Sequence, residues 1–183
     1  FHYLRGQSMP WNHKRVYRVY TQLNLNIRRK PKKRLPSRTK ESLYQPELPN
    51  RVWSMDFMFD RLTNGRSFRT LNILDDFNRE VVNIVVDTSI SSPRVARELS
   101  QMFEWRGKPG TIRVDNGPEF LALKPWCESN GIELKFIQPA KPNQNAYIER
   151  FNRTFREEVL DNYAFENLQQ ARVMTRSWMW MYN

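Results

Sequence analysis

The chain of 183 residues is poor in the side chains that most often build small catalytic or metal sites. Its one cysteine, Cys127, excludes an internal disulfide framework and is typical of a reducing compartment. Both histidines, His2 and His13, lie near the start, so the rest of the chain has none for a Cys/His zinc site or a Ser-His-Asp triad. Any catalysis there must use carboxylates, lysines, hydroxyls or a carboxylate-bound metal.

Long apolar runs are also missing. No stretch approaches the roughly 20 apolar residues that span a bilayer, and we find no signal-peptide pattern. We therefore expect no membrane partner and a cytoplasmic location. With 39% hydrophobic and 13% aromatic residues, the chain has enough apolar side chains to bury a core.

Positive charge is abundant and unevenly placed. The net charge is +11, and residues 1–50 carry 12 Lys/Arg against 2 Asp/Glu. The densest run comprises Arg28, Arg29, Lys30, Lys32, Lys33 and Arg34, interrupted only by Pro31. Such a run repels itself and predicts an extended arm that neutralises nucleic-acid phosphates, with affinity that falls steeply with salt. A solvated tail or a localisation signal is the alternative.

The pattern divides the chain into three segments. Residues 1–27 are predicted to be the end of a small helical module, because Asn12 is placed to cap a helix with Val16, Tyr20 and Leu23 on one face. Residues 28–50 form a basic, proline-containing linker, and residues 51–183 form the main domain. The chain begins without Met and ends inside a helical pattern, so we expect a fragment, truncated at its C-terminus.

Alternation of apolar and polar residues in the main domain predicts strands at 52–60, 68–74, 80–87, 110–114 and 132–137. Helices are predicted from Ser92-Pro93 to Gly107, over 119–129 and 144–162, and from Asn167 onward. The first three strands form a meander, and a right-handed crossover places the fourth beside the first. The prediction is an α/β, ribonuclease H-like domain, with a five-stranded mixed sheet in the order 3-2-1-4-5 and helices on both faces.

Three acids stand out against this framework. Asp56 interrupts an apolar strand, Asp115 follows the adjacent fourth strand directly, and Glu149 lies on the long helix. Taken singly, each has an ordinary explanation: a satisfied structural Asp, a turn residue, and a surface partner of Arg153. The topology favours convergence at the ends of adjacent parallel strands.

Converging carboxylates need a cation. Two charges about 5 Å apart repel by roughly 3 kcal/mol at an effective dielectric near 20. Oxygen-only ligands favour Mg²⁺ or Mn²⁺, and two such ions can assist attack on a phosphodiester. The acids thus predict a two-metal site.

At four motifs the chain resembles the catalytic subunits of bacterial insertion-sequence transposases, which share an Asp-Asp-Glu core with retroviral integrases. The motifs are Trp53-Ser54-Met55-Asp56-Phe57, Leu74-Asp75-Asp76-Phe77-Asn78-Arg79-Glu80, Val114-Asp115-Asn116-Gly117-Pro118-Glu119-Phe120, and Pro142-Asn143-Gln144-Asn145-Ala146-Tyr147-Ile148-Glu149-Arg150-Phe151-Asn152. The interval between the second and third acids is slightly shorter than is usual in the family, and the shortfall falls around Lys124-Pro125.

The resemblance implies a metal-dependent polynucleotidyl transferase that cleaves double-stranded DNA at element ends and joins the freed 3′-OH to a target. Asp56, Asp115 and Glu149 are then the catalytic metal ligands, and Asn116 and Gly117 shape the turn at Asp115. DNA backbone contacts are predicted for Lys141, Arg150, Arg153 and Arg156, for which solvated helix charges are the alternative. The resemblance also implies a homo-multimer on DNA, a possible upstream helix-turn-helix subunit and a nucleoid location in a bacterium.

Two other functions remain open from the sequence. A ribonuclease H-like nuclease fits the fold, although its second acid usually lies on the first helix, which here offers Glu98 and Glu104. A catalytically inactive DNA-binding remnant of a transposase also fits, because the presence of all three acids does not exclude truncation.

Overall fold

The structure is a computed structural model that describes residues 4–5, 8–25, 45–138 and 145–183. The chain divides into two compact units, Phe1–Lys40 and Glu41–Asn183, which are considered separately. In the first, helix α2 (His13–Gln22) begins as predicted, with Asn12 Oδ1 accepting the Arg15 N–H at 2.9 Å. None of its side chains is buried, so its apolar stripe is not part of a core among the described residues.

The second unit is built on one five-stranded sheet. Its strands are β1 (Val52–Arg61), β2 (Ser67–Asp75), β3 (Val81–Asp87), β4 (Thr111–Val114) and β5 (Glu133–Phe136). The order β3-β2-β1-β4-β5 confirms the predicted topology. β1, β2 and β3 pair antiparallel, whereas β4 pairs parallel to both β1 and β5.

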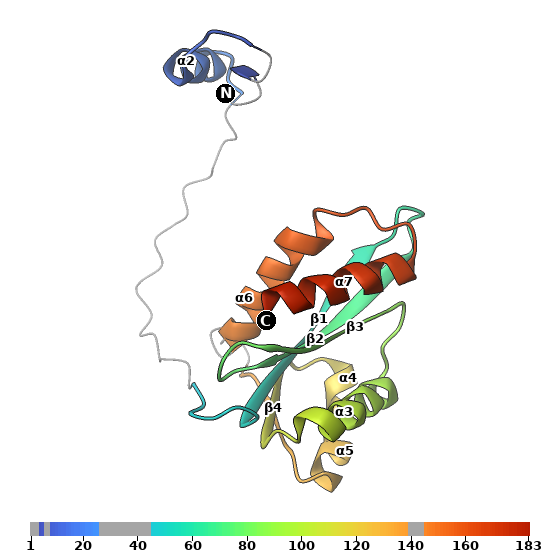
Figure 1. Ribbon diagram of the computed structural model, residues 1–183. Coiled ribbons are helices and arrows are strands. Elements are labelled where there is room, and N and C mark those ends of the chain that lie inside the picture. Colours follow the sequence, from blue (N-terminus) through green and yellow to red (C-terminus); the bar gives the residue numbers. More distant parts are fainter. Residues whose placement is uncertain (1–3, 6–7, 26–44, 139–144) are drawn as a thin grey trace. The chain divides into compact units, whose positions relative to one another are not determined.

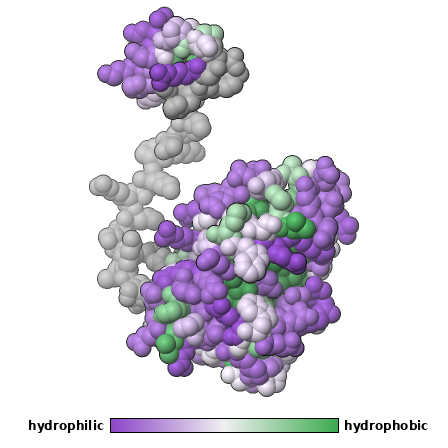
Figure 2. Space-filling view, viewed as in Figure 1, coloured by the Kyte–Doolittle hydropathy of each residue, from purple (hydrophilic) through white to green (hydrophobic). Residues whose placement is uncertain are grey.

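Helices cover both faces of this sheet (Figure 1). Helices α3 (Ser92–Arg106), α4 (Pro118–Leu121) and α5 (Lys124–Ser129) lie on one side, and α6 (Ala146–Phe155) and α7 (Leu168–Tyr182) on the other. Alternation along β1 divides its side chains between the layers: Trp53 and Met55 enter the core beneath α3, and Met58 enters the core beneath α6. The face shown in Figure 2 is mostly hydrophilic, as expected when the apolar side chains are enclosed between layers.

Two details of the helices differ from the sequence prediction. The single helix expected over 119–129 is two short helices, because Pro125 has no N–H to give and restricts Lys124 before it, which favours a new helix start there. The N-cap of α3 is Ser91 rather than Ser92, whose hydroxyl donates to the Glu119 carbonyl at 2.5 Å. Both differences affect the side of the sheet that carries the loop after β4.

The helix predicted over residues 144–162 is also shorter than expected. α6 ends at Phe155 and continues as one π-helical turn, η2 (Arg156–Leu160), and α7 then begins after its Asn167 cap. Trp178 of α7 packs against Phe151 and Phe155, with ring centroids 5.8 and 5.1 Å apart. α7 therefore holds α6 against the sheet.

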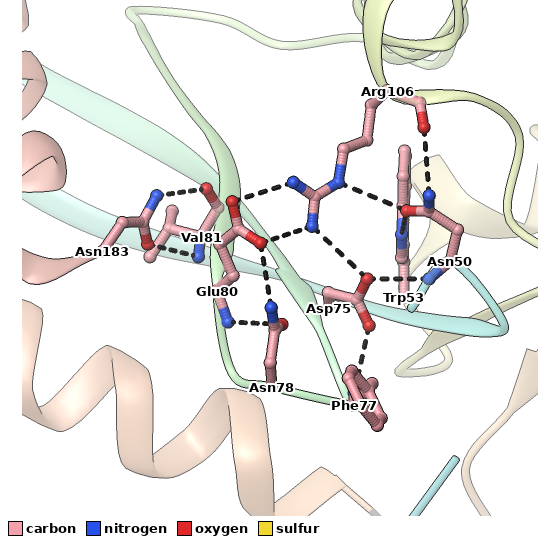
Figure 3. Close-up of polar contacts among 9 residues, drawn as sticks. All are labelled: Asn50, Trp53, Asp75, Phe77, Asn78, Glu80, Val81, Arg106 and Asn183. Carbon is pink, nitrogen blue, oxygen red and sulfur yellow. Dashed lines mark hydrogen bonds and ion pairs between the residues drawn. The ribbon is translucent and has the colours of Figure 1, made fainter. Parts of the chain in front are cut away.

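A polar network stabilises the turn between β2 and β3 (Figure 3). Asp75 accepts the N–H groups of Asn50 and Phe77 at 2.8 and 3.0 Å, and Arg106 at the end of α3 pairs with Glu80. The side chain of Asn183 bonds both the N–H and the carbonyl of Val81. The turn thereby joins the start of β1, the end of α3 and the end of α7.

Among the described residues, no helix is long and apolar enough to cross a bilayer.

Candidate active site

Asp56 occupies the middle of β1 on the face covered by α6. It is half-buried, and its carboxylate accepts two hydrogen bonds: Oδ1 from the Phe57 N–H at 2.8 Å and Oδ2 from Asn152 Nδ2 at 2.7 Å. The side chains of β1 point alternately into the two cores, and this alternation places Asp56 on the face of the sheet that α6 covers. Asp56 is therefore held at the boundary between the sheet and α6.

Asp115 follows β4 and lies in register with Asp56. β1 and β4 pair Val52 with Thr111 and Ser54 with Arg113, so continuing by two residues brings Asp115 opposite Asp56. Parallel neighbours lie about 4.8 Å apart in a sheet. The half-buried Asp115 thus stands beside Asp56 at the edge of the paired region.

The turn after Asp115 is fixed by the two residues predicted to shape it. The Gly117 N–H donates to Asp115 Oδ1 at 3.0 Å, and Asn116 Nδ2 donates to the Ile137 carbonyl at 3.1 Å. A Cβ at position 117 would stand 3.0 Å from Asp115 Oδ1, closer than side chains normally tolerate. Glycine therefore leaves the carboxylate room in this turn.

Glu149 lies in the first turn of α6. This helix packs on β1 and β2 through Ile148, Phe151 and Phe155, and Glu149 itself is exposed. Glu149 lies near the other two acids because α6 packs on β1 next to Asp56. The site thus draws on one side chain from each of three elements that are far apart in the sequence.

Electrostatics ties the three acids together. The pKa of Asp56 is raised from 3.8 to about 6, mainly by burial and also by the charges of Asp115 and Glu149, while the bonds from the Phe57 N–H and Asn152 oppose the rise. The acids are thus near enough to repel, yet among the described residues no three acidic, His or Cys side chains stand close enough to hold a metal ion without moving. Asp56 and Asp115 instead point carboxylate oxygens at protein N–H groups.

A buried ion pair lies next to these acids on the same face of the sheet. Arg113, two residues before Asp115, bonds Asp76 Oδ2 at 2.9 Å, and the Ser54 hydroxyl donates to Asp76 Oδ1 at 2.6 Å. Asp76 is fully buried, and burial raises its pKa to about 6 although Ser54 and Arg113 oppose this. The pair connects β1, β4 and the β2–β3 turn beneath the site.

The basic residues predicted to contact DNA divide into three groups. Arg150 and Arg153 are exposed on α6 beside Glu149. Arg156 instead bonds the Phe59 carbonyl at 2.9 Å and lies near Asp60 and Asp161. The remaining basic residues lie outside the described part of the chain: Arg28, Arg29, Lys30, Lys32, Lys33, Arg34 and Lys141.

The sequence interpretation missed a clamp beside the site. Arg69 of β2 bonds Glu119 of α4 at 2.6 Å, and its guanidinium lies 4.1 Å from the centre of the Phe57 ring. Phe57 in turn stacks on Phe120 at 5.0 Å. These contacts fasten the segment after Asp115 to β1, the strand that carries Asp56. The sequence interpretation missed them because Arg69 is not part of a motif that includes Asp56 or Asp115.

The sequence interpretation also gave no role to Asn152. It is buried beneath α6 and faces the sheet, because α6 approaches β1 and β2 closely there. Asn72, which it contacts, carried a signal that was not used: an amide between Leu71 and Ile73, in the apolar part of β2.

A five-stranded sheet in this order, with helices on both faces and acids on adjacent parallel strands and the covering helix, defines the ribonuclease H-like class. The chain belongs to the integrase core domain family, whose sequence pattern matches residues 46–142; a second integrase core pattern matches residues 130–183.

Two relatives are proteins of bacterial insertion elements. The chain is 47% identical to an uncharacterized 31.7 kDa protein of insertion element IS407 from Burkholderia multivorans, over 94% of this chain and 63% of the relative. It is 43% identical to an uncharacterized 39.2 kDa protein of insertion element IS476 from Xanthomonas euvesicatoria, over 98% of this chain and 53% of the relative. The chain thus spans between half and two thirds of the length of these relatives.

Solved structures share the fold. The HTLV-2 integrase catalytic core domain in complex with magnesium has a TM-score of 0.59 at 22% identity, covering 76% of this chain and 88% of that one. A chain in the structure of the simian T-cell lymphotropic virus intasome in complex with PP2A regulatory subunit B56 gamma has the same TM-score at 20% identity, covering 81% of this chain and 54% of that one. At these identities the likeness establishes the architecture alone.

Proposed function

We propose that this chain is the catalytic part of a DNA transposase that cleaves phosphodiesters at insertion-sequence ends and transfers the freed strand to target DNA. The observation that carries the proposal is that one half-buried carboxylate, Asp56, lies close enough to Asp115 and Glu149 for both charges to raise its pKa. Family membership and the insertion-element relatives support the same reaction.

The donor set fits Mg²⁺ or Mn²⁺, because carboxylate oxygens are the ligands these ions prefer. Asp56, Asp115 and Glu149 would together hold the ions, which we expect to be two in number. Because no three acids in the described part of the chain are arranged to hold an ion as they stand, binding requires these side chains to rearrange. When bound, such ions neutralise developing negative charge and activate an attacking oxygen.

The remaining residues position the reactants. Exposed Arg150 and Arg153, with Arg156 and Lys141, hold the DNA backbone beside the acids, and the arm of residues 28–34 supplies further phosphate contacts. A water first cleaves the strand and frees a 3′-OH, which then displaces a second phosphodiester in line. Asn116 and Gly117 keep Asp115 in its turn throughout.

The same proposal covers the wider organisation. We assign residues 1–27 to the end of a DNA-binding module, 28–50 to the linker and 51–183 to the catalytic core. The protein acts as a homo-multimer on double-stranded DNA in the bacterial nucleoid, with a helix-turn-helix subunit reading the element ends.

The substitution Asp115→Asn tests the proposal. It keeps the size of the side chain and an oxygen for the Gly117 N–H, but removes a negative ligand. We expect Mg²⁺-dependent cleavage and strand transfer to fall by at least about a hundredfold, since a direct ligand is lost. DNA binding, measured by fluorescence anisotropy on an end duplex, should stay within about twofold because phosphate contacts dominate affinity.

The matched control is Glu128→Gln, which removes an exposed carboxylate on α5 whose nearest cation is Lys124 at 3.9 Å. It should leave cleavage and binding unchanged. Equal cleavage by the wild type and Asp115→Asn would refute the catalytic assignment. Loss of both activities in Asp115→Asn, with unfolding seen by circular dichroism, would assign Asp115 a structural role instead.

A further inference from the structure

A chain of two side-chain amides leads from the interior of the sheet to the catalytic acid. Asn72 of β2 is the cross-strand partner of Asp56, and it is fully buried. Its Nδ2 donates to Asn152 Oδ1 at 2.7 Å, and Asn152 Nδ2 donates to Asp56 Oδ2 at 2.7 Å. The two amides thus connect β2, α6 and β1 at one point.

The direction of these bonds determines what Asn152 presents to the acid. An asparagine amide offers an oxygen on one side and an NH₂ on the other. Because Asn72 donates to the oxygen of Asn152, the NH₂ of Asn152 must face Asp56. Without that donor, the amide of Asn152 could rotate and present its oxygen to a carboxylate, which is repulsive.

Asn72 itself is costly to bury. Among the described residues its Oδ1 has no hydrogen-bond partner, and its Nδ2 has only the Met58 sulfur, at 3.2 Å, besides Asn152. A buried polar atom without a partner destabilises a fold, whereas an apolar side chain between Leu71 and Ile73 would satisfy the core. Stability therefore does not explain an amide at this position.

We propose that Asn72 is a positioning residue that acts through Asn152 to hold the Asp56 carboxylate in the orientation that receives a divalent cation. The inference rests on the proposed function, because it concerns the same carboxylate. Asn72 touches neither DNA nor metal in this scheme. Its role is to fix the rotation of one amide.

The test measures Mn²⁺ binding by the full chain, as free Mn²⁺ in electron paramagnetic resonance titrations, together with thermal unfolding in EDTA. Asn72→Leu should weaken Mn²⁺ binding by about tenfold, the lower end of what outer-shell partners of a metal site contribute. Its melting temperature should stay close to that of the wild type, because removing the unpaired Asn72 oxygen offsets the loss of the donor to Asn152 Oδ1. Asn72→Ser, too short to reach Asn152, replaces it if the leucine variant does not fold.

A double-mutant cycle separates a relay from two independent effects. If Asn72 acts only through Asn152, adding Asn72→Leu to Asn152→Ala should weaken Mn²⁺ binding no further. Asn83→Leu is the matched control: it replaces another asparagine of the sheet, on β3, that no hydrogen bond connects to Asp56 among the described residues. It should leave Mn²⁺ affinity unchanged.

Unchanged Mn²⁺ affinity in Asn72→Leu, or losses that add in the double variant, would overturn the relay. A lower melting temperature with normal affinity would make Asn72 a structural residue. Mn²⁺ binding that is absent from the wild type, and equally absent from Asp115→Asn, would instead contradict the proposed metal site, and the relay would be rejected with it.

Discussion

At the scale of single residues, the unusual feature is an acid placed where ionisation is unfavourable. Burial and the nearby charges of Asp115 and Glu149 raise the pKa of Asp56 to about 6, from 3.8. The folded protein therefore binds this proton more tightly than the unfolded chain. The stabilisation from that proton is fully present below about pH 4 and is lost as the pH rises through 6.

This gives a prediction on stability rather than activity. Asp56→Asn removes the titration, so stability should decline less between pH 4 and pH 7.5 in the variant than in the wild type. The comparison uses urea unfolding in EDTA at four pH values across this range. Because asparagine changes the bonds to Phe57 and Asn152 at every pH, the slope and not the absolute stability is compared. Asp76, whose pKa burial also raises to about 6, contributes equally to both proteins.

Parallel curves for the two proteins would show that Asp56 ionises in the fold as easily as in the unfolded chain. That result would contradict the crowding of the three acids.

At the scale of elements, the position of Glu149 depends on α7 as much as on its own helix. Trp178 is buried between Phe151, Phe155 and Tyr182, and its indole N–H donates to Glu158 at 2.8 Å. α6 spans ten residues and one π-helical turn, so a packed neighbour is needed to hold it.

Trp178→Ala should therefore destabilise the protein by about 3–5 kcal/mol, the range for removing a large buried aromatic side chain. Chemical denaturation measures this loss. Trp180→Ala is the matched control, since Trp180 lies on the same helix with 79% of its surface exposed, and should change stability by less than about 0.5 kcal/mol. Similar losses in both variants would mean that α7 does not hold α6 in place.

At the scale of the whole molecule, charge and carboxylates are separated along the chain. Residues 1–50 carry almost all of the excess positive charge, whereas the remainder, which contains all three acids, is nearly neutral. A basic segment of this kind releases counterions when it binds a polyanion. We expect the arm to supply affinity and the core to supply chemistry.

Binding to duplex DNA should accordingly weaken with salt, with a log–log slope of about −4 if roughly five phosphates are contacted. Replacing Arg28, Arg29 and Lys30 by alanine should reduce the magnitude of this slope by up to about 3. Anisotropy titrations at several salt concentrations measure both values. A slope near zero, or one unaffected by the triple substitution, would exclude the arm from phosphate binding.

The strand order was predictable because strong local signals agree along the chain. Asn64-Gly65 favours a hairpin turn between β1 and β2, where Gly65 has a φ of 81°, and the prolines and caps mark most helix starts. The break between α4 and α5 was missed although Pro125 favours it, and the π-helical turn after Phe155 was not predicted. The burial of Asn152 was not predictable from the sequence, because the depth at which a helix residue lies depends on how closely the helix approaches the sheet.

The sequence by itself determined the order of the elements, the identity of the three acids and the uneven distribution of charge, since periodicity, turn residues and composition are local properties. Only the tertiary structure decided which groups face Asp56, and how. The bonds from Asn152 to Asp56 and from Asn72 to Asn152 join residues 96 and 80 positions apart, and such contacts exist only after strands and helix have packed. A side chain's neighbours across layers depend on register and helix rotation, which no short stretch of sequence encodes.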